Sequence, residues 1–334
     1  MTFIFRLSIL VTCVIVIPFH VHGIEIGTPW STSFEYPQSC VHNRAADGGS
    51  TSCAAVQNDA VDWVFAGGST NPPSQVLSAA NYPFGMGGMG ARFWVGDGHN
   101  QNSAPAVLTF SEPKKELWIR WYMRYQKGFQ WKDNSIHYNK VLYIRTQCSH
   151  NAAIPSLLTN DFSMETQDSY QAAQRFGGAG WNGTYGPGPS NGEWHCFEVH
   201  MKMDSAGIHG GGFRTPDVQP FNGVARMWLN GRLVGEKTNV NYSNGYADAR
   251  QGWFRILFNH NQNEVDNRNG PIGQSWGYVD FDDMVVYTEK PPNVDAHGNP
   301  FIGPVGAGGG KPSPPVEEPE KPIDPPSNFR LIGN

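Results

Sequence analysis

Several segments of the chain alternate between apolar and polar residues, and this period of two constrains the fold more than any other feature. Residues 194–203 alternate in this way. So do residues 116–125, where one face would carry Leu117, Ile119, Trp121, Met123 and Tyr125 and the other Trp118, Arg120, Tyr122 and Arg124. Successive side chains of a β-strand point to opposite faces of a sheet, so both segments are predicted to be strands with one buried face.

Further strands are predicted over residues 139–145, 224–229, 232–235, 254–260 and 278–287. Asn230-Gly231, between two of them, is a dipeptide typical of hairpin turns. Helical periodicity is scarce, and residues 161–175 are the one stretch where a short helix is expected. The pattern predicts an all-β chain with few short helices, folded as a two-sheet antiparallel β-sandwich or jelly roll.

The composition excludes several other classes of protein. Only 16% of residues are charged, against roughly 25% in most soluble domains. Long helices with alternating charges need more Glu and Lys, so a coiled coil or a helical repeat is excluded. The net charge of −5 argues against a non-specific nucleic-acid binder, and no nucleic-acid partner is expected.

The two ends of the chain differ from its middle. Residues 1–23 have the features of a secretory signal peptide, with Arg6 before an apolar run from Leu7 to Phe19 that is too short to span a bilayer. Residues 291–334 are rich in Pro and Gly and are predicted to be a disordered tail or linker. We expect one jelly-roll domain over residues 24–290, in a secreted (extracellular or periplasmic) protein that does not insert into a membrane.

Cysteine usage agrees with export. Removal of the signal peptide leaves an even number of cysteines, which suggests disulfides with three possible connectivities. The pairs Cys40–Cys53 and Cys148–Cys196 are favoured, with free buried thiols as the alternative. No C-x-x-C spacing occurs, so a zinc site is not expected.

A glycine pattern at residues 85–90, GMGGMG, matches that of dinucleotide-binding loops. Such a loop needs a strand before it and a helix after it. Here Asn81-Tyr-Pro-Phe precedes the glycines and the strand-like residues 91–95 follow. We therefore expect no nucleotide cofactor.

Three later segments resemble the closing strands of concanavalin-A-like jelly rolls: GEWHCFEVHMKM (192–203), NGVARMWLNGRLVGE (222–236) and WGYVDFDDMVVYTE (276–289). Within that superfamily, ELWIRWYMRYQKGFQW (116–131) and HYNKVLYIR (137–145) are similar to the central strands of polysaccharide lyases of the glucuronan-lyase and heparin-lyase-I type. The resemblance covers about residues 110–288. It implies a jelly-roll fold and a uronate polysaccharide as substrate, although similar strand patterns also occur in lectins and laminin-G-like modules.

The chemistry of such a lyase selects candidate residues. The enzyme must remove the proton beside a uronate carboxyl group, protonate the leaving oxygen, and neutralise the carboxylate. We assign His137 and Tyr143 as base and acid, and Arg120 as the neutralising cation. For each residue the alternative is an ordinary solvated sheet surface. Further substrate-binding candidates are Tyr122, Arg124, Asn139, Lys140, His200, Asn259 and His260.

Aromatic and acidic residues support two further interpretations. Trp131 and Trp181 lie in loop-like sequence and are candidates for stacking on sugar rings. A retaining glycosidase would need two carboxylates about 5 Å apart across the sugar. Neither E-x-D-x-E nor E-x-D-x-x-E occurs, and Asp161 with Glu165 is the nearest arrangement. A glycoside hydrolase is therefore less favoured.

A carboxylate cluster in VDFDD suggests a structural cation. Asp280, Asp282 and Asp283 are close in sequence, and like charges this near need a cation, hydrogen bonds or solvent. The resembled jelly rolls often hold Ca²⁺ in this region together with a Glu from the first strand. The expected ligands are Glu35, Asp282 and Asp283, with backbone carbonyls completing the shell.

Taken together, these features predict a secreted lyase that cleaves a uronate-containing, anionic polysaccharide by β-elimination. The alternative from another class is a non-catalytic, lectin-like carbohydrate-binding module. A monomer is expected. The sequence leaves open which polymer is bound and whether it is cleaved from within or from an end.

Overall fold

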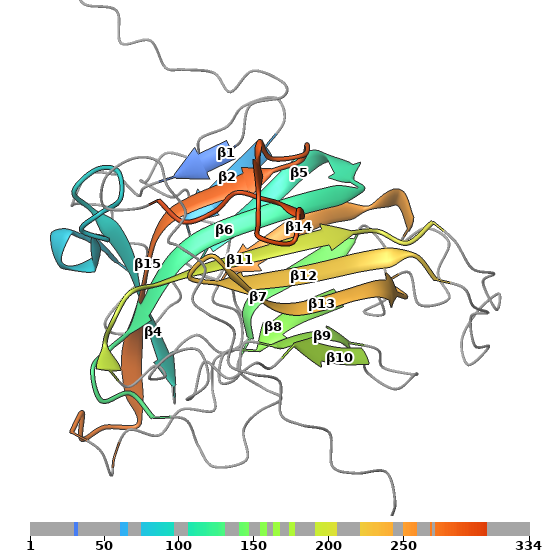
Figure 1. Ribbon diagram of the computed structural model, residues 1–334. Coiled ribbons are helices and arrows are strands. Elements are labelled where there is room, and N and C mark those ends of the chain that lie inside the picture. The colour runs from blue at the N-terminus through green and yellow to red at the C-terminus, as the bar shows by residue number, and fades with distance from the viewer. Residues whose placement is uncertain are drawn as a thin grey trace, which may run out of the picture.

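A computed structural model of the chain describes residues 30–32, 61–65, 75–96, 106–130, 140–146, 154–158, 163–167, 174–177, 191–205, 221–242, 250–258, 268 and 271–305. Over these ranges the dominant element is the β-strand, and the strands form two antiparallel sheets packed face to face (Figure 1). The predicted two-sheet β-sandwich is therefore confirmed. No helix within these ranges is long and apolar enough to cross a membrane.

The first sheet, called sheet A, has eight strands. Seven of them lie side by side, and β1 (Trp30–Thr32) pairs with part of β15 outside that row. The order is β13 (Arg232–Val240), β12 (Gly223–Leu229), β11 (His195–Lys202), β6 (Glu116–Tyr125), β15 (Trp276–Tyr287), β4 (Gly90–Gly96) and β3 (Gln75–Leu77), which leads into the 3-10 turn η1 (Ser78–Ala80).

The second sheet, called sheet B, has seven strands and covers the inner face of sheet A. Its order is β10 (Gln174–Gly177), β9 (Ser163–Gln167), β8 (Ile154–Leu158), β7 (Lys140–Thr146), β14 (Trp253–Phe258), β5 (Ala106–Lys114) and β2 (Val61–Phe65). The helix expected over residues 161–175 is wrong where that stretch is described. It contains β9 and the start of β10, and Met164 of β9 fills the core at 0% exposure, so burial on a sheet outweighs a weak helical pattern.

Alternation along each strand decides which residues fill the space between the sheets. The apolar face predicted for β6 is buried in the core, together with the inward residues of β11, β12, β15 and β4. Leu108, Phe110, Leu142, Ile144, Ile256 and Phe258 face them from sheet B. The hairpin predicted at Asn230-Gly231 is also confirmed, because both residues have the positive φ (52° and 81°) that the tight turn between β12 and β13 requires.

Strands β5, β6 and β7 follow one another in the sequence but alternate between the two sheets. The chain bends at Lys115, so β5 lies in sheet B and β6 in sheet A, and it returns to sheet B at β7. The neighbours of β6 are instead β11 and β15. Consequently the outward side chains of β6 and β7 lie on opposite outer faces of the sandwich.

Residues 291–305, called the C-terminal strap, continue the fold beyond the domain end that we predicted at residue 290. They include the short hairpin β16 (Asn293–Val294) and β17 (Pro300–Phe301), and they cross the outer face of sheet A (Figure 1). Phe301 and Ile302 are only 5% and 9% exposed. We therefore predicted the start of the linker at least fifteen residues too early. The Pro- and Gly-rich residues form a packed hairpin, and backbone groups of the strap bind sheet A.

Cys196 is a free, buried thiol, so the predicted Cys148–Cys196 disulfide is wrong. Cys196 lies on β11 of sheet A, where its Cα partner is Tyr122 and its strand neighbour Phe197 faces the core. The side chain of Cys196 therefore points to the outer face of sheet A. Cys148 follows β7 of sheet B in the sequence. Cys40, Cys53 and Cys148 lie outside the described residues.

Candidate functional site

The structure does not bring together the three residues that we assigned to catalysis. Arg120 lies on the outer face of sheet A, whereas Tyr143 lies on the outer face of sheet B, on the far side of the core. Arg120 therefore cannot neutralise a carboxylate held at Tyr143, and that assignment is wrong. His137 lies outside the described residues.

Arg120 and Tyr122 bind the C-terminal strap. Arg120 is 5% exposed and donates from Nη1 to the carbonyl oxygen of Gly303 at 3.1 Å. The Tyr122 hydroxyl donates to the carbonyl of Val305 at 3.1 Å and accepts from its N–H at 2.7 Å. Both side chains are thus buried under the chain's own backbone and unavailable to a polymer.

Buried Glu198 completes this attachment. Its carboxylate accepts hydrogen bonds from the N–H groups of Ile302 at 2.5 Å and Gly303 at 2.9 Å. Burial raises the pKa of Glu198 to about 7, while the two N–H donors and the nearby Arg120 pull it downward. The strap is therefore held mainly through its main chain. One of the groups that bind this main chain is a carboxyl group that titrates near neutral pH.

Arg124 and His200 also have partners within the protein. Arg124 donates from Nε to Asp280 at 2.9 Å, and its guanidinium lies 4.8 Å from the ring centroid of Trp194. The ring of His200 is 3% exposed and lies between Glu116 and an arginine of β12. The polar side chains of β6 are therefore engaged in contacts within the protein. The alternation that suggested a substrate-binding face reflects these internal contacts.

A different set of polar side chains lies on the outer face of sheet B. Tyr143 and Arg145 are two residues apart on β7, so they share a face, opposite the core residues Leu142 and Ile144. Arg255 of β14 is the Cα partner of Arg145, and its Nε donates to the Thr109 hydroxyl on β5 at 3.2 Å.

Electrostatics couple the tyrosine to Arg145, one of these two arginines. Burial raises the pKa of the Tyr143 hydroxyl, and the positive charge of Arg145 partly offsets that shift. Tyr143 therefore stays protonated at neutral pH with a cation nearby. Arg145 and Arg255, directly opposite each other, concentrate positive charge in a chain whose net charge is −5.

The strand register continues from Tyr143 across the sheet. The Cα partner of Tyr143 on β8 is Ser156, followed by Glu165 on β9 and Arg175 on β10. Lys140, a predicted polymer contact, begins β7, one residue after the predicted start of this strand. We had not selected Arg145 or Arg255 from the sequence. The usable signal was the alternation in VLYIR, which already puts Arg145 on the same face as Tyr143.

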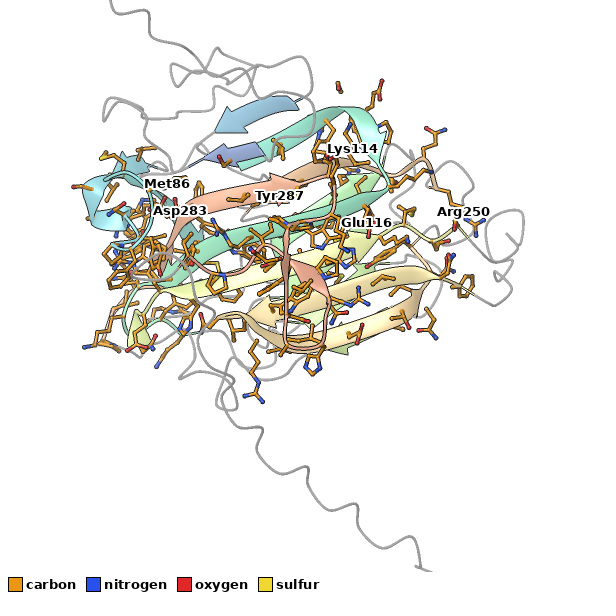
Figure 2. The ribbon with its side chains drawn as sticks, turned by 45° about the horizontal axis from the view of Figure 1, so that its top comes forward. Met86, Lys114, Glu116, Arg250, Asp283 and Tyr287 are labelled. Atoms are coloured by element: carbon orange, nitrogen blue, oxygen red, sulfur yellow. The ribbon has the colours of Figure 1, made fainter. Side chains whose placement is uncertain are left out.

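The carboxylates expected to bind calcium are bonded to backbone N–H groups. Asp282 accepts from the N–H groups of Tyr82 and Asp283, both at 2.7 Å, and Asp283 accepts from the N–H of Met86. Figure 2 shows Met86 and Asp283 side by side. N–H donors aimed at both carboxylates suit the bare anions and do not favour a cation, and no group of three metal-ligating side chains occurs among the described residues. The third expected ligand, Glu35, lies outside them, so calcium stays a prediction.

The remaining predicted binding residues lie outside the described ranges. They are Asn139, Trp131, Trp181, Asn259 and His260. Asn139 directly precedes β7, and Asn259 and His260 directly follow β14. Three of these residues are therefore adjacent in sequence to the two strands that carry Tyr143, Arg145 and Arg255.

Comparison with known protein families adds to this geometry. The sequence model of one family, described as polysaccharide lyase, matches residues 66–278, well over half of the chain. The chain belongs to the polysaccharide lyase family. The matched residues include β7 and β14, so the arginine pair and Tyr143 lie within the family region. Among curated proteins, no sequence matches the chain closely enough to count as a relative.

Solved structures include remote likenesses. Endo-β-1,4-glucuronan lyase from the fungus Trichoderma reesei is 14% identical with a TM-score of 0.39, covering 65% of this chain and 87% of that one. Alginate lyase vAL-1 from a Chlorella virus is 12% identical with a TM-score of 0.36, covering 60% and 84%. The cellulose-induced protein Cip1 is 13% identical with a TM-score of 0.39, covering 78% and 97%. Similarity at this level carries no conclusion about activity.

Proposed function

We propose that this family member cleaves a uronate-containing polysaccharide by β-elimination on the outer face of sheet B. The observation that carries the proposal is the cross-strand pair Arg145–Arg255 beside half-buried Tyr143. Family membership supports a carbon–oxygen lyase. The glucuronan and alginate lyases among the solved structures act, by their printed names, on uronate polymers.

The reaction requires two proton transfers and one bond cleavage. A base takes the proton from the sugar carbon next to the carboxyl group, and the electron pair forms a carbon–carbon double bond. The bond to the glycosidic oxygen of the neighbouring sugar breaks, and that oxygen takes a proton from an acid. Negative charge builds up on the carboxylate as the first proton leaves, so cations close to it lower the barrier.

Residues of sheet B match these roles. Arg145 and Arg255 would hold the uronate carboxylate, because guanidinium groups bind carboxylates bidentately. Tyr143, which is protonated at neutral pH and whose pKa burial raises further, would donate to the leaving oxygen. His137, three residues before β7, remains our proposed base, with Asn139 and Lys140 as polymer contacts.

The test is the ultraviolet absorbance of the unsaturated sugar that β-elimination leaves on the product. Glucuronan and alginate are supplied in parallel, with a neutral glucan as control. We expect Tyr143→Phe to lower kcat by about two orders of magnitude, the usual contribution of a general acid. Tyr287→Phe, a half-buried tyrosine of sheet A, should leave kcat unchanged.

Two outcomes would contradict the proposal. Full activity of both Tyr143→Phe and Arg145→Gln would show that the catalytic site does not lie on the outer face of sheet B. Binding of the polymers without any unsaturated product would favour the lectin-like alternative.

Export is part of the same proposal, because a polymer-degrading enzyme must reach its substrate. Residues 1–23 would direct the chain out of the cytoplasm and be removed. The measurement is the mass of the protein recovered outside the cell, which should lack those residues.

A further inference from the structure

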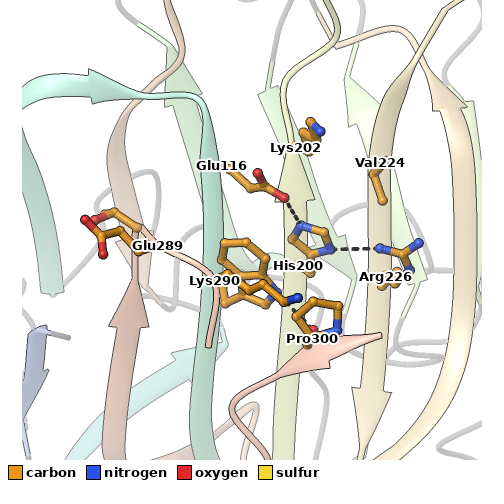
Figure 3. A pocket seen from close by; sticks show the side chains of 10 residues that line it. Glu116, His200, Lys202, Val224, Arg226, Glu289, Lys290 and Pro300 are labelled. Carbon is orange, nitrogen blue, oxygen red and sulfur yellow. Dashed lines mark hydrogen bonds and ion pairs between the residues drawn. The ribbon is translucent and has the colours of Figure 1, made fainter. Parts of the chain in front are cut away.

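A pocket of about 380 Å³ opens on the outer face of sheet A (Figure 3). Its volume lies within the range of about 300–1,000 Å³ typical of ligand sites. The lining comes from β6, β11 and β12, from the residues after β15, and from Pro300 of the C-terminal strap. Because Tyr143 and Arg255 lie on the outer face of sheet B, the core of the sandwich separates this pocket from the proposed catalytic face.

The floor of the pocket is a histidine held in one state. His200 is stacked on Trp118 with ring centroids 4.3 Å apart. Arg226 approaches the Nδ1 atom of His200 from Nη1 at 3.2 Å, and Glu116 lies 2.7 Å from Nε2 (Figure 3). An arginine can only donate, so Nδ1 must be the acceptor and Nε2 carries the proton given to Glu116. Each polar atom of the floor is thereby oriented before any ligand arrives.

The strap fixes the opposite wall. Trp118 donates from Nε1 to the carbonyl of Pro300 at 3.0 Å, and Glu198 accepts from the N–H groups of Ile302 and Gly303. A preformed wall of this kind lowers the ordering cost of binding. This wall is formed by residues that follow the family match over residues 66–278, namely Thr288, Glu289, Lys290 and Pro300.

The charges of the lining define the ligand. Lys202, Arg226 and Lys290 line the pocket together with Glu116 and Glu289, of which Glu116 is engaged by His200. Arg226 is paired with Glu236 at 2.7 Å. Lys202 and Lys290 are exposed, and Figure 3 draws no ion pair between either of them and another lining residue. Two ammonium groups suit a carboxylate, while carboxylate oxygens nearby suit sugar hydroxyls.

We propose that this pocket is a second, non-catalytic binding site for an acidic sugar unit of a polysaccharide. The identity of the polymer rests on the function proposed above, whereas the site itself does not depend on catalysis. A polysaccharide held in this pocket would have a raised local concentration at the catalytic face. Polymers long enough to reach both places would therefore gain affinity that short oligomers lack.

The binding test uses the Tyr143→Phe chain, so that the probe is not consumed, and an acidic trisaccharide of glucuronan as probe. Titration is followed by NMR at the Trp118 indole N–H and the His200 ring, which report on this pocket alone. We expect saturable shifts. Lys290→Ala should weaken binding about tenfold, the loss of one charge-assisted hydrogen bond, and Lys202→Ala/Lys290→Ala should abolish it. Lys127→Ala, an exposed lysine outside the pocket, is the charge-matched control and should bind normally.

Absence of shifts at Trp118 and His200, or equal binding of a neutral glucan trisaccharide, would overturn the proposal. In the catalytically intact chain, Lys202→Ala/Lys290→Ala should raise KM for long polymer and leave kcat and the cleavage of short oligomers unchanged. A chain that cleaves nothing but still shows the shifts would refute the proposed function and keep this site.

Discussion

Glu198 makes the stability of the fold depend on pH in a direction opposite to that of most carboxylates. Its pKa is raised from the ordinary 4.5 to about 7, first of all by burial beneath the strap. When pH rises from 4.5 towards 7, the unfolded chain loses this proton while the folded chain keeps it. Folding then takes up a proton, so this group's contribution to stability is complete at low pH and is lost as pH rises through 7.

The magnitude follows from the size of the shift. A difference of about 2.5 pH units, at about 1.36 kcal/mol per unit, corresponds to a loss on the order of 3 kcal/mol between pH 4.5 and 8. The substitution Glu198→Gln isolates this effect. A glutamine resembles the protonated acid, with one carbonyl oxygen to accept an N–H of the strap, and it does not titrate.

The assay is urea unfolding followed by tryptophan fluorescence at several values of pH, with stability extrapolated to water. We expect wild type and Glu198→Gln to differ little near pH 4.5 and the variant to become relatively more stable by about 3 kcal/mol at pH 8. Glu112→Gln, which removes an exposed carboxyl group, is the control. A wild-type chain that gains stability relative to Glu198→Gln as pH rises would refute the reasoning. It would mean that Arg120 and the two N–H donors outweigh the cost of burial.

Three further predictions concern the strap, the buried thiol and a buried ion pair. A chain ending at residue 290 should lose on the order of 5 kcal/mol of unfolding free energy relative to one ending at 305, because several hydrogen bonds to the strap, each worth about 1 kcal/mol, are lost; equal melting temperatures would contradict this. Cys196, whose pKa burial raises to about 12, should react with a thiol reagent only after unfolding, and rapid labelling of the native chain would disprove its burial. Asp280→Asn should cost about 3 kcal/mol in urea unfolding, since it leaves Arg92 and Arg124 without the carboxylate they share at 2.7 and 2.9 Å, and an unchanged midpoint would sink that expectation.

The fold could be predicted from the sequence further than the site could. Alternation identified β6 and β11 and assigned each side chain to the correct face, because a half-buried strand repeats every two residues whatever it pairs with. The same pattern does not say which sheet a strand joins. Arg120 and Tyr143 were therefore combined in one site, although they lie on opposite sides of the core.

The strap was missed for a related reason. The linker was predicted for residues 291–305 because they are rich in Pro and Gly. What holds the strap is its backbone. Its carbonyl oxygens accept hydrogen bonds from Trp118, Arg120 and Tyr122, and two of its N–H groups donate to Glu198. Backbone groups are the same in every sequence, so no local pattern marks a segment that docks through them.

The place of β15 in sheet A has a consequence for how the protein is made. Residues 276–287 lie between β4 and β6, so two strands from the first half of the chain become neighbours only through a strand near its end. While the ribosome is still translating the middle of the message, β4 and β6 each carry an unpaired edge. Exposed edges invite pairing with other chains, and contacts this distant in sequence form slowly. The emerging polypeptide should therefore depend on chaperones, or on crossing a membrane unfolded, until β15 has been synthesised.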